Sequence, residues 1–207
     1  MFIVFEGIDG SGKSTQARLL EEYLRKKRRF DTLLVREPGG TELGEKVREL
    51  ILQPGPEAIE PETELFLFMA ARAHLVRTRI IPALEAGRVV ISDRFLWSSV
   101  AYQGLAMGLL AQEILRMGRL DAPGITVTKT FLIDIDPETA FRRVKDPNRM
   151  EKRGIEFQRR VREGFLSLAE RFKTRVAVVN GRGTLEAVHA RVISKLPTHG
   201  WSKCSSL

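Results

Sequence analysis

The start of the chain joins a short apolar segment to a glycine-rich loop and then to a helical pattern. Residues 2–5 are apolar, residues 7–15 read GIDGSGKST, and apolar residues with helical spacing follow from Ser14. This arrangement fits G-x-x-x-x-G-K-[ST] in the strand–loop–helix setting that the motif requires. Glycines let the backbone curl, so that successive N–H groups and the helix N-terminus face phosphate oxygens. The segment therefore predicts an α/β fold with a phosphate-binding loop.

Two residues of this loop carry specific chemistry. The Lys13 ammonium is predicted to reach the β- and γ-phosphates of a nucleotide, and the Ser14 hydroxyl is predicted to ligate Mg²⁺. A glycine-rich turn that matches the motif by chance is the alternative, and the flanking strand and helix disfavour it. The residues predicted to bind the nucleotide triphosphate are Gly7, Ile8, Asp9, Gly10, Ser11, Gly12, Lys13, Ser14 and Thr15.

Strand-like and helix-like segments alternate along the rest of the chain. Short apolar, β-branched runs predict strands over residues 2–5, 32–35, 88–92, 130–135 and 175–179. Helical spacing predicts helices over residues 14–27, 42–52, 62–86, 95–108, 137–145, 155–172 and 184–196. Strands that alternate with helices pair in parallel. We expect a single domain over residues 1–196, an open parallel five-stranded sheet with helices on both faces, followed by a loose tail over 197–207.

Composition excludes several classes of protein. The 207 residues are 43% hydrophobic and 29% charged, which is ordinary for a globular domain and excludes a disordered chain. The longest apolar run covers residues 65–71, far short of the roughly 18 residues that span a bilayer. Cys204 is the single cysteine, and the three histidines form no HExxH pattern, which argues against disulfides and a zinc site. We therefore expect a cytoplasmic protein without a signal peptide.

The net charge of +8 is concentrated in one segment. Residues 142–175 hold 12 Arg and Lys against 5 Asp and Glu. Such an excess suggests an anionic partner, either nucleic acid or the phosphates of a small molecule, and a solvated helix face is the alternative. The aromatic residues of this segment, Phe157, Phe165 and Phe172, fall at helical core spacing, so a stacking platform for bases is poorly supported.

Other classes of nucleotide-binding protein fit less well than a small kinase. The chain has no N-K-x-D that would read guanine, and no apolar strand leads into the D-x-x-G match at residues 121–124, which we interpret as a loop. A nucleic-acid motor usually needs a larger chain. A small-molecule kinase is therefore the favoured hypothesis.

Three further segments narrow the choice of kinase. They read REPGGT at residues 36–41, FLFMAAR at residues 66–72, and DRF at residues 93–95 with SSVAYQ at residues 98–103. Together with FEGIDGSGKST, this order resembles the bacterial thymidylate kinase family of nucleoside monophosphate kinases, from Met1 to about Val192. The resemblance implies a P-loop kinase domain that uses ATP and Mg²⁺ to phosphorylate dTMP to dTDP in dTTP synthesis. It also implies a homodimer, with the helix over 62–86 as its interface, and neither a nucleic-acid nor a membrane partner.

The resemblance assigns roles around the third strand. It implies that Asp93 holds the Mg²⁺ shell and that Arg94 binds the acceptor phosphate, for which a guanidinium offers a fork of N–H donors. An ion pair at the strand end is the alternative for these two residues. Phe68 and Arg72 lie four apart on one helix face. The resemblance implies that Phe68 stacks on thymine and that Arg72 donates to its O4.

Other residues of the predicted dTMP site follow from the same resemblance. Ser99 is placed near the N3/O4 edge of the base, and Gln103 belongs to the same motif. Asp9 opposes the phosphates that its loop attracts, which suggests a second role, and the resemblance implies that it binds the sugar 3′-OH. Tyr102 is expected to pack under the sugar, and Pro38 to form part of the wall around the base. Arg36 either reaches the phosphates or braces its loop by pairing with Glu37.

A basic segment near residues 143–154 resembles a lid. Family members without an arginine in the phosphate loop supply basic residues from such a lid, and this chain has Asp9-Gly10-Ser11 at that place. The resemblance implies catalytic roles for Lys13, Arg94 and lid arginines, among which Arg149 and then Arg143 are favoured. The lid candidates are Arg143, Lys145, Arg149 and Arg153. A kinase for another nucleoside monophosphate, or a basic nucleic-acid-binding NTPase, stays open as an alternative.

Overall fold

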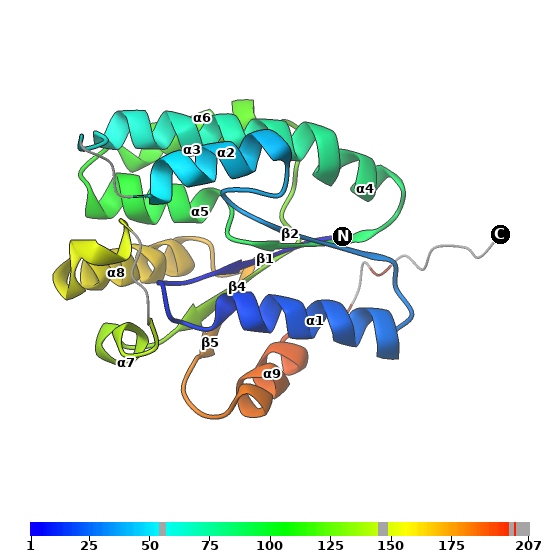
Figure 1. Cartoon of the computed structure of the whole chain (residues 1–207). Coiled ribbons are helices and arrows are strands. Elements are labelled where there is room, and N and C mark those ends of the chain that lie inside the picture. The colour runs from blue at the N-terminus through cyan, green and yellow to red at the C-terminus, as the bar shows by residue number, and fades with distance from the viewer. Residues whose placement is uncertain (54–56, 145–148, 199–200, 202–207) are drawn as a thin grey trace.

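Five parallel strands form a single sheet at the centre of the computed structural model (Figure 1), which describes residues 1–53, 57–144, 149–198 and 201. The strand order is β2-β3-β1-β4-β5. Each predicted strand is confirmed to within one residue at either end, and so is the parallel pairing. The strands are β1 (Phe2–Glu6), β2 (Thr32–Arg36), β3 (Val89–Asp93), β4 (Lys129–Asp134) and β5 (Val176–Asn180).

Helices cover both faces of this sheet, as the alternation in the sequence predicts. The longest are α1 (Lys13–Lys27), α3 (Pro61–Leu75) and α8 (Ile155–Arg171). Side chains of Thr41, Asp136 and Thr184 accept backbone N–H bonds at the N-termini of three other helices. The remaining helical elements are α2 (Glu42–Leu52), η1 (Val76–Ile80), α4 (Ile81–Glu85), α5 (Leu96–Ser99), η2 (Val100–Ala106), α6 (Ala111–Asp121), α7 (Pro137–Phe141), η3 (Glu151–Arg153) and α9 (Leu185–Ser194).

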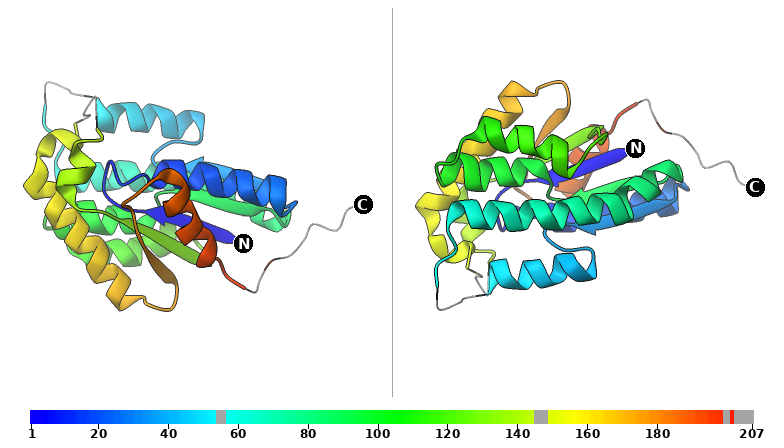
Figure 2. Two further views of the ribbon diagram at one scale, coloured as in Figure 1. Left: turned by 90° about the horizontal axis from the view of Figure 1, so that it is seen from below. Right: turned by 90° about the horizontal axis from the view of Figure 1, so that it is seen from above.

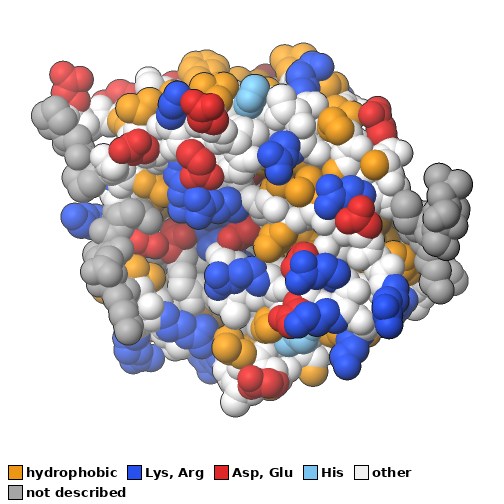
Figure 3. All heavy atoms as spheres, turned by 45° about the vertical axis from the view of Figure 1, so that its right-hand side comes forward, with side chains coloured by type: hydrophobic (Ala, Val, Ile, Leu, Met, Phe, Trp, Pro, Cys, Tyr) orange, Lys and Arg blue, Asp and Glu red, His pale blue; other side chains and the backbone are white. Residues whose placement is uncertain are grey.

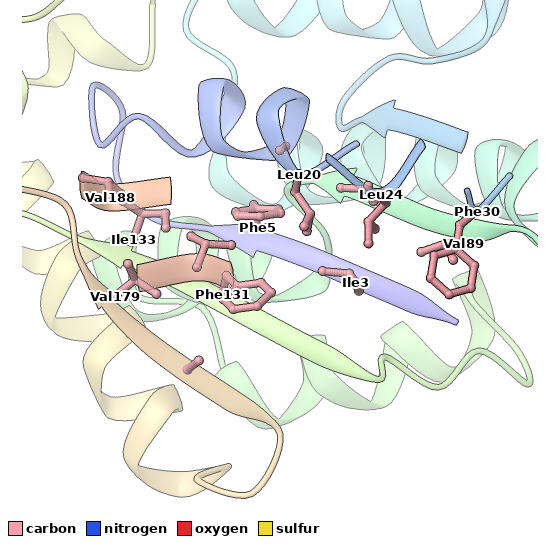
Figure 4. Packing of buried hydrophobic residues seen from close by; sticks show 14 residues of the cluster. Ile3, Phe5, Leu20, Leu24, Phe30, Val89, Phe131, Ile133, Val179 and Val188 are labelled. Carbon is pink, nitrogen blue, oxygen red and sulfur yellow. The ribbon is translucent and has the colours of Figure 1, made fainter. Parts of the chain in front are cut away.

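Alternate residues of the central strands face two different cores. Ile3 and Phe5 of β1 pack with α1 and α9, as Figure 4 shows. Phe2 and Val4 point to the other face and pack against η1 and α4. On that second face α8 packs over β4, and α3 lies between α2 and α6 (Figure 2). Because the five strands are parallel, their carboxyl ends lie at the same edge of the sheet, where open α/β folds place ligands.

Three predicted helices differ in detail. The helix predicted over 62–86 contains the π-helical segment η1, in which Ile81 N donates to the Val76 carbonyl; Pro82 follows and cannot donate. The helix predicted over 95–108 is α-helical only in α5 and continues as the π-helical η2. The prediction over 137–145 is wrong at its end, because α7 stops at Phe141, and residues 145–148 lie outside the described part of the chain.

Helix α6 was not predicted. Gly118 interrupts its pattern and lowers its helical propensity. A Cβ at this position would lie 2.2 Å from Leu96 Cδ2, so glycine allows α6 to approach α5 closely. Asp121, which the sequence suggests to be in a loop, is the last residue of this helix and is buried.

Trp201 of the predicted tail packs on the domain. It stacks on Phe30 with ring centroids 5.0 Å apart, and the Arg28 guanidinium lies 5.6 Å from the centre of its ring. Within the tail it donates to the Pro197 carbonyl at 2.6 Å. Residues 199–200 and 202–207 lie outside the described residues. No helix in the described part of the chain is long and apolar enough to cross a membrane.

Candidate active site

The loop between β1 and α1 has the curled backbone that phosphate binding requires. Ser11 N donates to the Ile8 carbonyl at 3.2 Å, and Gln16 N donates to the Gly12 carbonyl at 3.0 Å. Gly10 has φ 77°, and a Cβ there would lie 2.2 Å from the Ala140 carbonyl oxygen. Gly12 has φ 93° at the N-terminus of α1. Both positions therefore require glycine.

Lys13 lies under this loop at the first turn of α1. Its side chain is buried, with Nζ 3.4 Å from the Ile8 carbonyl and 3.6 Å from Asp9 Oδ1. Burial and the nearby Arg94 guanidinium lower the pKa of Lys13. Lys13 also lines a cavity that Ser14, Asp93 and Arg94 share. The ammonium is thus held at the mouth of the loop, where it can face an anionic ligand.

Arg94 is fixed at the end of β3 in an unusual backbone conformation. Its φ of 74° lies in the left-handed region that favours glycine, and such strain is typical of functional sites. Its guanidinium donates to the Gly7 carbonyl at 3.2 Å, to Ser98 Oγ at 2.9 Å, to the Tyr102 hydroxyl at 3.2 Å and to the Asp9 carboxylate. One arginine thereby joins the phosphate loop to the segment after β3.

Asp9 accepts hydrogen bonds from two other residues of the predicted dTMP site. Arg94 donates to Oδ1 and the Tyr102 hydroxyl donates to Oδ2 at 2.8 Å. Burial alone would raise the pKa of Asp9, but the charges of Arg94 and Lys13 outweigh it and hold the pKa well below its usual value. Asp9 is therefore an ionised acceptor inside a loop that attracts anions.

Glu6 is a functional candidate that the sequence did not reveal. It is fully buried and accepts from Phe95 N at 3.0 Å, from Ser98 N at 3.2 Å and from Ser98 Oγ at 2.6 Å. Burial raises the pKa of Glu6 to about 7, although Ser98 and Arg94 act in the opposite direction. The same Ser98 hydroxyl accepts from Arg94, so Glu6 supports that guanidinium through Ser98. A carboxylate at the end of a buried strand was the only available signal.

Most of the predicted dTMP residues line one cavity. It holds roughly 490 Å³ of empty space, part of it open to solvent, which lies within the range of small-molecule sites. Its wall also contains Glu37, Arg48, Leu52, Ser98 and Met150, which were not predicted. The predicted residues in this wall are Asp9, Pro38, Phe68, Arg94, Ser99, Tyr102 and Gln103.

Arg72 lies behind this wall rather than among the lining residues described. It is 1% exposed and donates to Glu37 Oε2 at 2.7 Å, to Asp121 Oδ2 at 3.1 Å and to Ser99 Oγ at 2.9 Å. Burial raises the pKa of Glu37 to about 7 and raises that of Asp121, against the attraction of the guanidinium. Three of the five N–H groups of Arg72 are used in this way. Two are left for a ligand.

Arg36 does not make the contact with Glu37 that was considered for it. Its guanidinium donates to Glu45 Oε2 at 2.8 Å, and 54% of its side chain is exposed. Arg48 of α2 was not predicted, yet it donates to the Pro38 carbonyl at 3.0 Å and lines both the dTMP-side cavity and the Lys13 cavity. Arg48, rather than Arg36, lies where the two cavities meet.

Arg149 is tied to α3 and to the end of α2. Its guanidinium donates to the buried carboxylate of Glu64 and to the Ile51 carbonyl at 2.6 Å. Arg153 also donates to Glu64, at 3.2 Å. In this conformation these partners hold the Arg149 guanidinium, and its role as a lid residue stays a prediction. Lys145 lies outside the described residues.

Arg143, by contrast, lies beside the phosphate loop. Its Nη1 is 3.4 Å from the Gly10 carbonyl oxygen. It lines a further cavity together with residues 10–16 and with the loop after β5, of which Gly181 and Thr184 are members. That loop was not predicted to take part in the site. Its glycines were the only signal in the sequence.

The residues predicted to hold Mg²⁺ fit a metal that brings its own further ligands. Ser14 is exposed and lines the same cavity as Asp93, whose buried Oδ1 has no hydrogen-bond partner in the described structure. No group of three or more His, Cys, Asp or Glu side chains among the described residues could hold a metal by itself. Mg²⁺ prefers oxygen ligands and is usually bound by one or two protein groups together with phosphates and water. Ser14 and Asp93 meet that requirement.

Many charges of the basic segment over 142–175 are paired within the domain. Arg159 donates to Glu138 of α7, and Arg162 donates to Asp134 of β4 at 2.6 and 2.9 Å. These acidic partners lie outside the segment, so its net charge is partly neutralised in the folded chain. This pairing favours a structural role for part of the segment over nucleic-acid binding.

The parallel sheet, the phosphate loop with Lys13 and the adjoining cavity at Arg94 define a P-loop kinase. Comparison with known proteins makes the class specific: the sequence model of the thymidylate kinase family matches residues 5–192. A thymidylate kinase of Ruegeria pomeroyi is 47% identical over 204 residues, which cover 96% of this chain and 95% of that protein. One of Kosmotoga olearia is 43% identical over 198 residues, with 94% of each chain covered.

A solved structure agrees with the sequence comparison. The crystal structure of the Ehrlichia chaffeensis thymidylate kinase superposes with a TM-score of 0.77 and 36% identity, covering 94% of this chain and 96% of that one. The chain belongs to the thymidylate kinase family.

Proposed function

We propose that this chain transfers the γ-phosphoryl group of ATP to dTMP, forming dTDP and ADP, as a step of dTTP synthesis. The observation that carries the proposal is that the cavity of Phe68 and Gln103 and the cavity of Lys13 meet at four shared residues. These are Asp9, Glu37, Arg48 and Arg94. A nucleoside monophosphate in the first cavity would direct its phosphate at the phosphate loop in the second, as in-line transfer requires.

The groups around the phosphate loop are suited to bind the triphosphate of the phosphoryl donor. The amides of the loop and the Lys13 ammonium would hold the β- and γ-phosphates, and Arg143 would approach them from the other side of Gly10. Mg²⁺ held by Ser14 and Asp93 would supply charge neutralisation on these phosphates. The cavity between the phosphate loop, Gly181 and Thr184 would accept the rest of ATP.

Arg94 and Arg48 would bind the acceptor phosphate. Both are cationic and line the junction of the two cavities. An oxygen of that phosphate attacks the γ-phosphorus while the bond to the ADP oxygen breaks. The acceptor phosphate is already anionic at neutral pH, so the reaction needs no general base. Catalysis then depends on positioning and on charge stabilisation by Lys13, Arg94 and Arg143.

The cavity can read the hydrogen-bonding edge of thymine. Phe68 lines it and would stack on the base, and Arg72 would offer its two unused N–H groups to O4 beside Ser99. Gln103 Oε1 is buried and has no partner in the described structure, so it can accept from N3–H. Asp9 would accept from the sugar 3′-OH, with Tyr102 beneath the sugar. Cytosine presents a donor at C4 and an acceptor at N3, and both would be mismatched.

A steady-state assay with ATP and a panel of monophosphates tests the proposal. The methyl group of thymine is worth about 1 kcal/mol of apolar burial, and a mismatched buried polar group costs roughly 1–3 kcal/mol. The expected order of kcat/KM is dTMP, then dUMP lower by about tenfold, then dCMP lower by at least another order of magnitude. Equal values for dTMP and dCMP, or turnover that depends on added DNA, would contradict the proposal.

The finer assignments of assembly and location belong to the same proposal. Helices α2, α3 and α6 expose large apolar side chains, including Leu50 at 62%, Phe66 at 59% and Leu120 at 78%. Hydrophobic side chains lie along the corresponding upper edge of Figure 3. We propose that two copies pair through this surface, in the cytoplasm where ATP is available. Light scattering of the wild-type chain should give a dimer, and Phe66→Glu should give a monomer.

A further inference from the structure

Glu64 of α3 is a fully buried carboxylate to which the proposed reaction gives no role. It accepts from Gln103 Nε2 at 2.7 Å through Oε1. Its Oε2 accepts from Arg149 and, at 3.2 Å, from Arg153. Two segments that are distant from Glu64 in the sequence thus converge on its side chain. Only Gln103 among these partners lines the base cavity.

Glu64 determines which way the Gln103 amide points. A carboxylate can only accept hydrogen bonds, so the NH₂ group of Gln103 must face Glu64. The amide oxygen is then directed elsewhere, and it is buried with no hydrogen-bond partner among the described residues. The reversed amide would bring its oxygen against Glu64 Oε1 and leave these two oxygens without a donor. The reversed orientation is therefore strongly disfavoured.

We propose that Glu64 is a positioning residue that determines base specificity. By holding the Gln103 amide in one orientation, it makes Gln103 present an acceptor to position 3 of the bound pyrimidine. Thymine and uracil carry N3–H and match that acceptor, whereas N3 of cytosine is itself an acceptor. This inference rests on the proposed function, since it assumes a pyrimidine in the cavity of Phe68.

Arg149 and Arg153 contribute to this selection of the base. Their guanidinium groups keep a carboxylate, rather than a neutral amide, favourable at position 64. A glutamine there would offer both a donor and an acceptor to Gln103. The Gln103 amide could then reverse without loss of its hydrogen bond and donate Nε2–H to N3 of cytosine.

The test is the isosteric variant Glu64→Gln, assayed with dTMP, dUMP and dCMP. The ratio of kcat/KM for dTMP over dCMP should fall about tenfold or more, chiefly because dCMP improves. The ratio for dTMP over dUMP should stay the same, because both bases carry N3–H. A general disturbance of the site would change both ratios. An unchanged dTMP-to-dCMP ratio in the folded variant would overturn the inference.

Two matched variants address folding. Arg149→Met removes a partner of Glu64 but leaves the bond to Gln103, so it should not change either ratio. In Glu64→Gln the Arg149 guanidinium would lose its carboxylate partner. The double variant Glu64→Gln/Arg149→Met removes this guanidinium as well. Arg153 has 25% of its side chain exposed and can turn to solvent. The double variant should show the same fall in the dTMP-to-dCMP ratio, and an unchanged ratio in it would equally overturn the inference.

Gln103→Leu separates this inference from the function on which it rests. It should lower the dTMP-to-dCMP ratio whatever residue stands at position 64. If Gln103→Leu lowers the ratio and Glu64→Gln does not, only the role of Glu64 is wrong. If Gln103→Leu also leaves the ratio unchanged, Gln103 does not read N3 and the proposed base contacts fail. Absence of dTMP turnover in the wild-type chain would refute the proposed function itself.

Discussion

Replacing Arg72 by methionine should destabilise the fold far more than an ordinary arginine substitution. This guanidinium bridges two buried carboxylates, Glu37 at 2.7 Å and Asp121 at 3.1 Å, and the side chains of these two acids are 4% and 5% exposed. Methionine fills a similar length but offers no donor. Both carboxylates would then have to remain charged without a partner or take up a proton in the folded state.

The cost of protonation limits the loss of stability. Protonation at pH 7 costs little extra for a carboxyl whose pKa is already high in the folded wild type, and burial raises the pKa of Glu37 to about 7 and raises that of Asp121. Breaking a buried ion pair typically costs about 3–5 kcal/mol. We therefore expect Arg72→Met to lower the free energy of unfolding at pH 7 by up to about 3–5 kcal/mol.

The deficit should depend on pH in a definite direction. Without Arg72 the folded-state pKa values of Glu37 and Asp121 rise further above their unfolded values. The folded variant then binds protons that the unfolded chain has released, and its stability falls as the pH rises. Each carboxyl contributes at most about 1.4 kcal/mol per pH unit. The deficit of the variant should thus be smaller at pH 5.5 than at pH 7.5.

Urea unfolding followed by circular dichroism at the two pH values measures this deficit. Arg116→Met is the matched control, because Arg116 pairs with Glu113 on the surface and should matter by less than about 1 kcal/mol. The triple variant Arg72→Met/Glu37→Gln/Asp121→Asn removes the unpaired charges and should recover much of the loss. A stability of Arg72→Met within about 1 kcal/mol of wild type at pH 7.5 would refute the reasoning.

Three further predictions concern the phosphate loop, the lid and Glu6. Lys13→Ala should lower kcat by at least about 1,000-fold, because a charge on the transferring phosphates is lost in a dry site, with little effect on unfolding; near-normal turnover would contradict the loop assignment. Arg143→Ala should lower kcat with little change in the KM for dTMP. Arg149→Ala should mainly lower thermal stability, because Glu64 would have one cation fewer. The opposite pattern would favour Arg149 over Arg143 as the catalytic lid residue. Burial raises the pKa of Glu6 to about 7, so wild-type stability falls as the pH rises from about 4.5 to 7, and Glu6→Gln should flatten that fall in urea titrations at pH 5 and 7.

The sheet and the phosphate loop could be predicted because their signals are local. Each strand is a short apolar run between turns, and GIDGSGKST is a continuous motif. Helix α6 was missed although its other apolar residues follow helical spacing, and the reason for its Gly118, the contact with Leu96, is visible only in the fold. The π-helical η1 and η2 could not be predicted either, since nothing in a helical pattern distinguishes one extra residue in a turn.

The residues of the candidate site also differ in how far they could be predicted from the sequence. Phe68, Arg94 and Gln103 could be placed at the cavity because they belong to recognisable motifs. Arg149 also matched a motif, yet its charge is bound by Glu64, 85 residues away in the sequence. A motif match therefore indicates which side chains stand near one another, but the pairing of their charges depends on which elements the topology brings together.

The supporting residues of the site share one chemistry that a sequence conceals. Arg72 is held by Glu37 at a separation of 35 residues and Gln103 by Glu64 at 39. Ser98, which accepts from Arg94, is held by Glu6 at 92. Glutamate in a sequence suggests the surface, because an unpaired buried carboxylate is costly. These three glutamates can be buried because hydrogen-bond donors contact them at one edge of the sheet. At that edge meet the carboxyl ends of β1 and β2, helix α3 and the segment after β3. Arg72, Gln103 and Arg94 thus depend on acceptors that belong to other elements. Those acceptors can be recognised only once the strand order β2-β3-β1 is known.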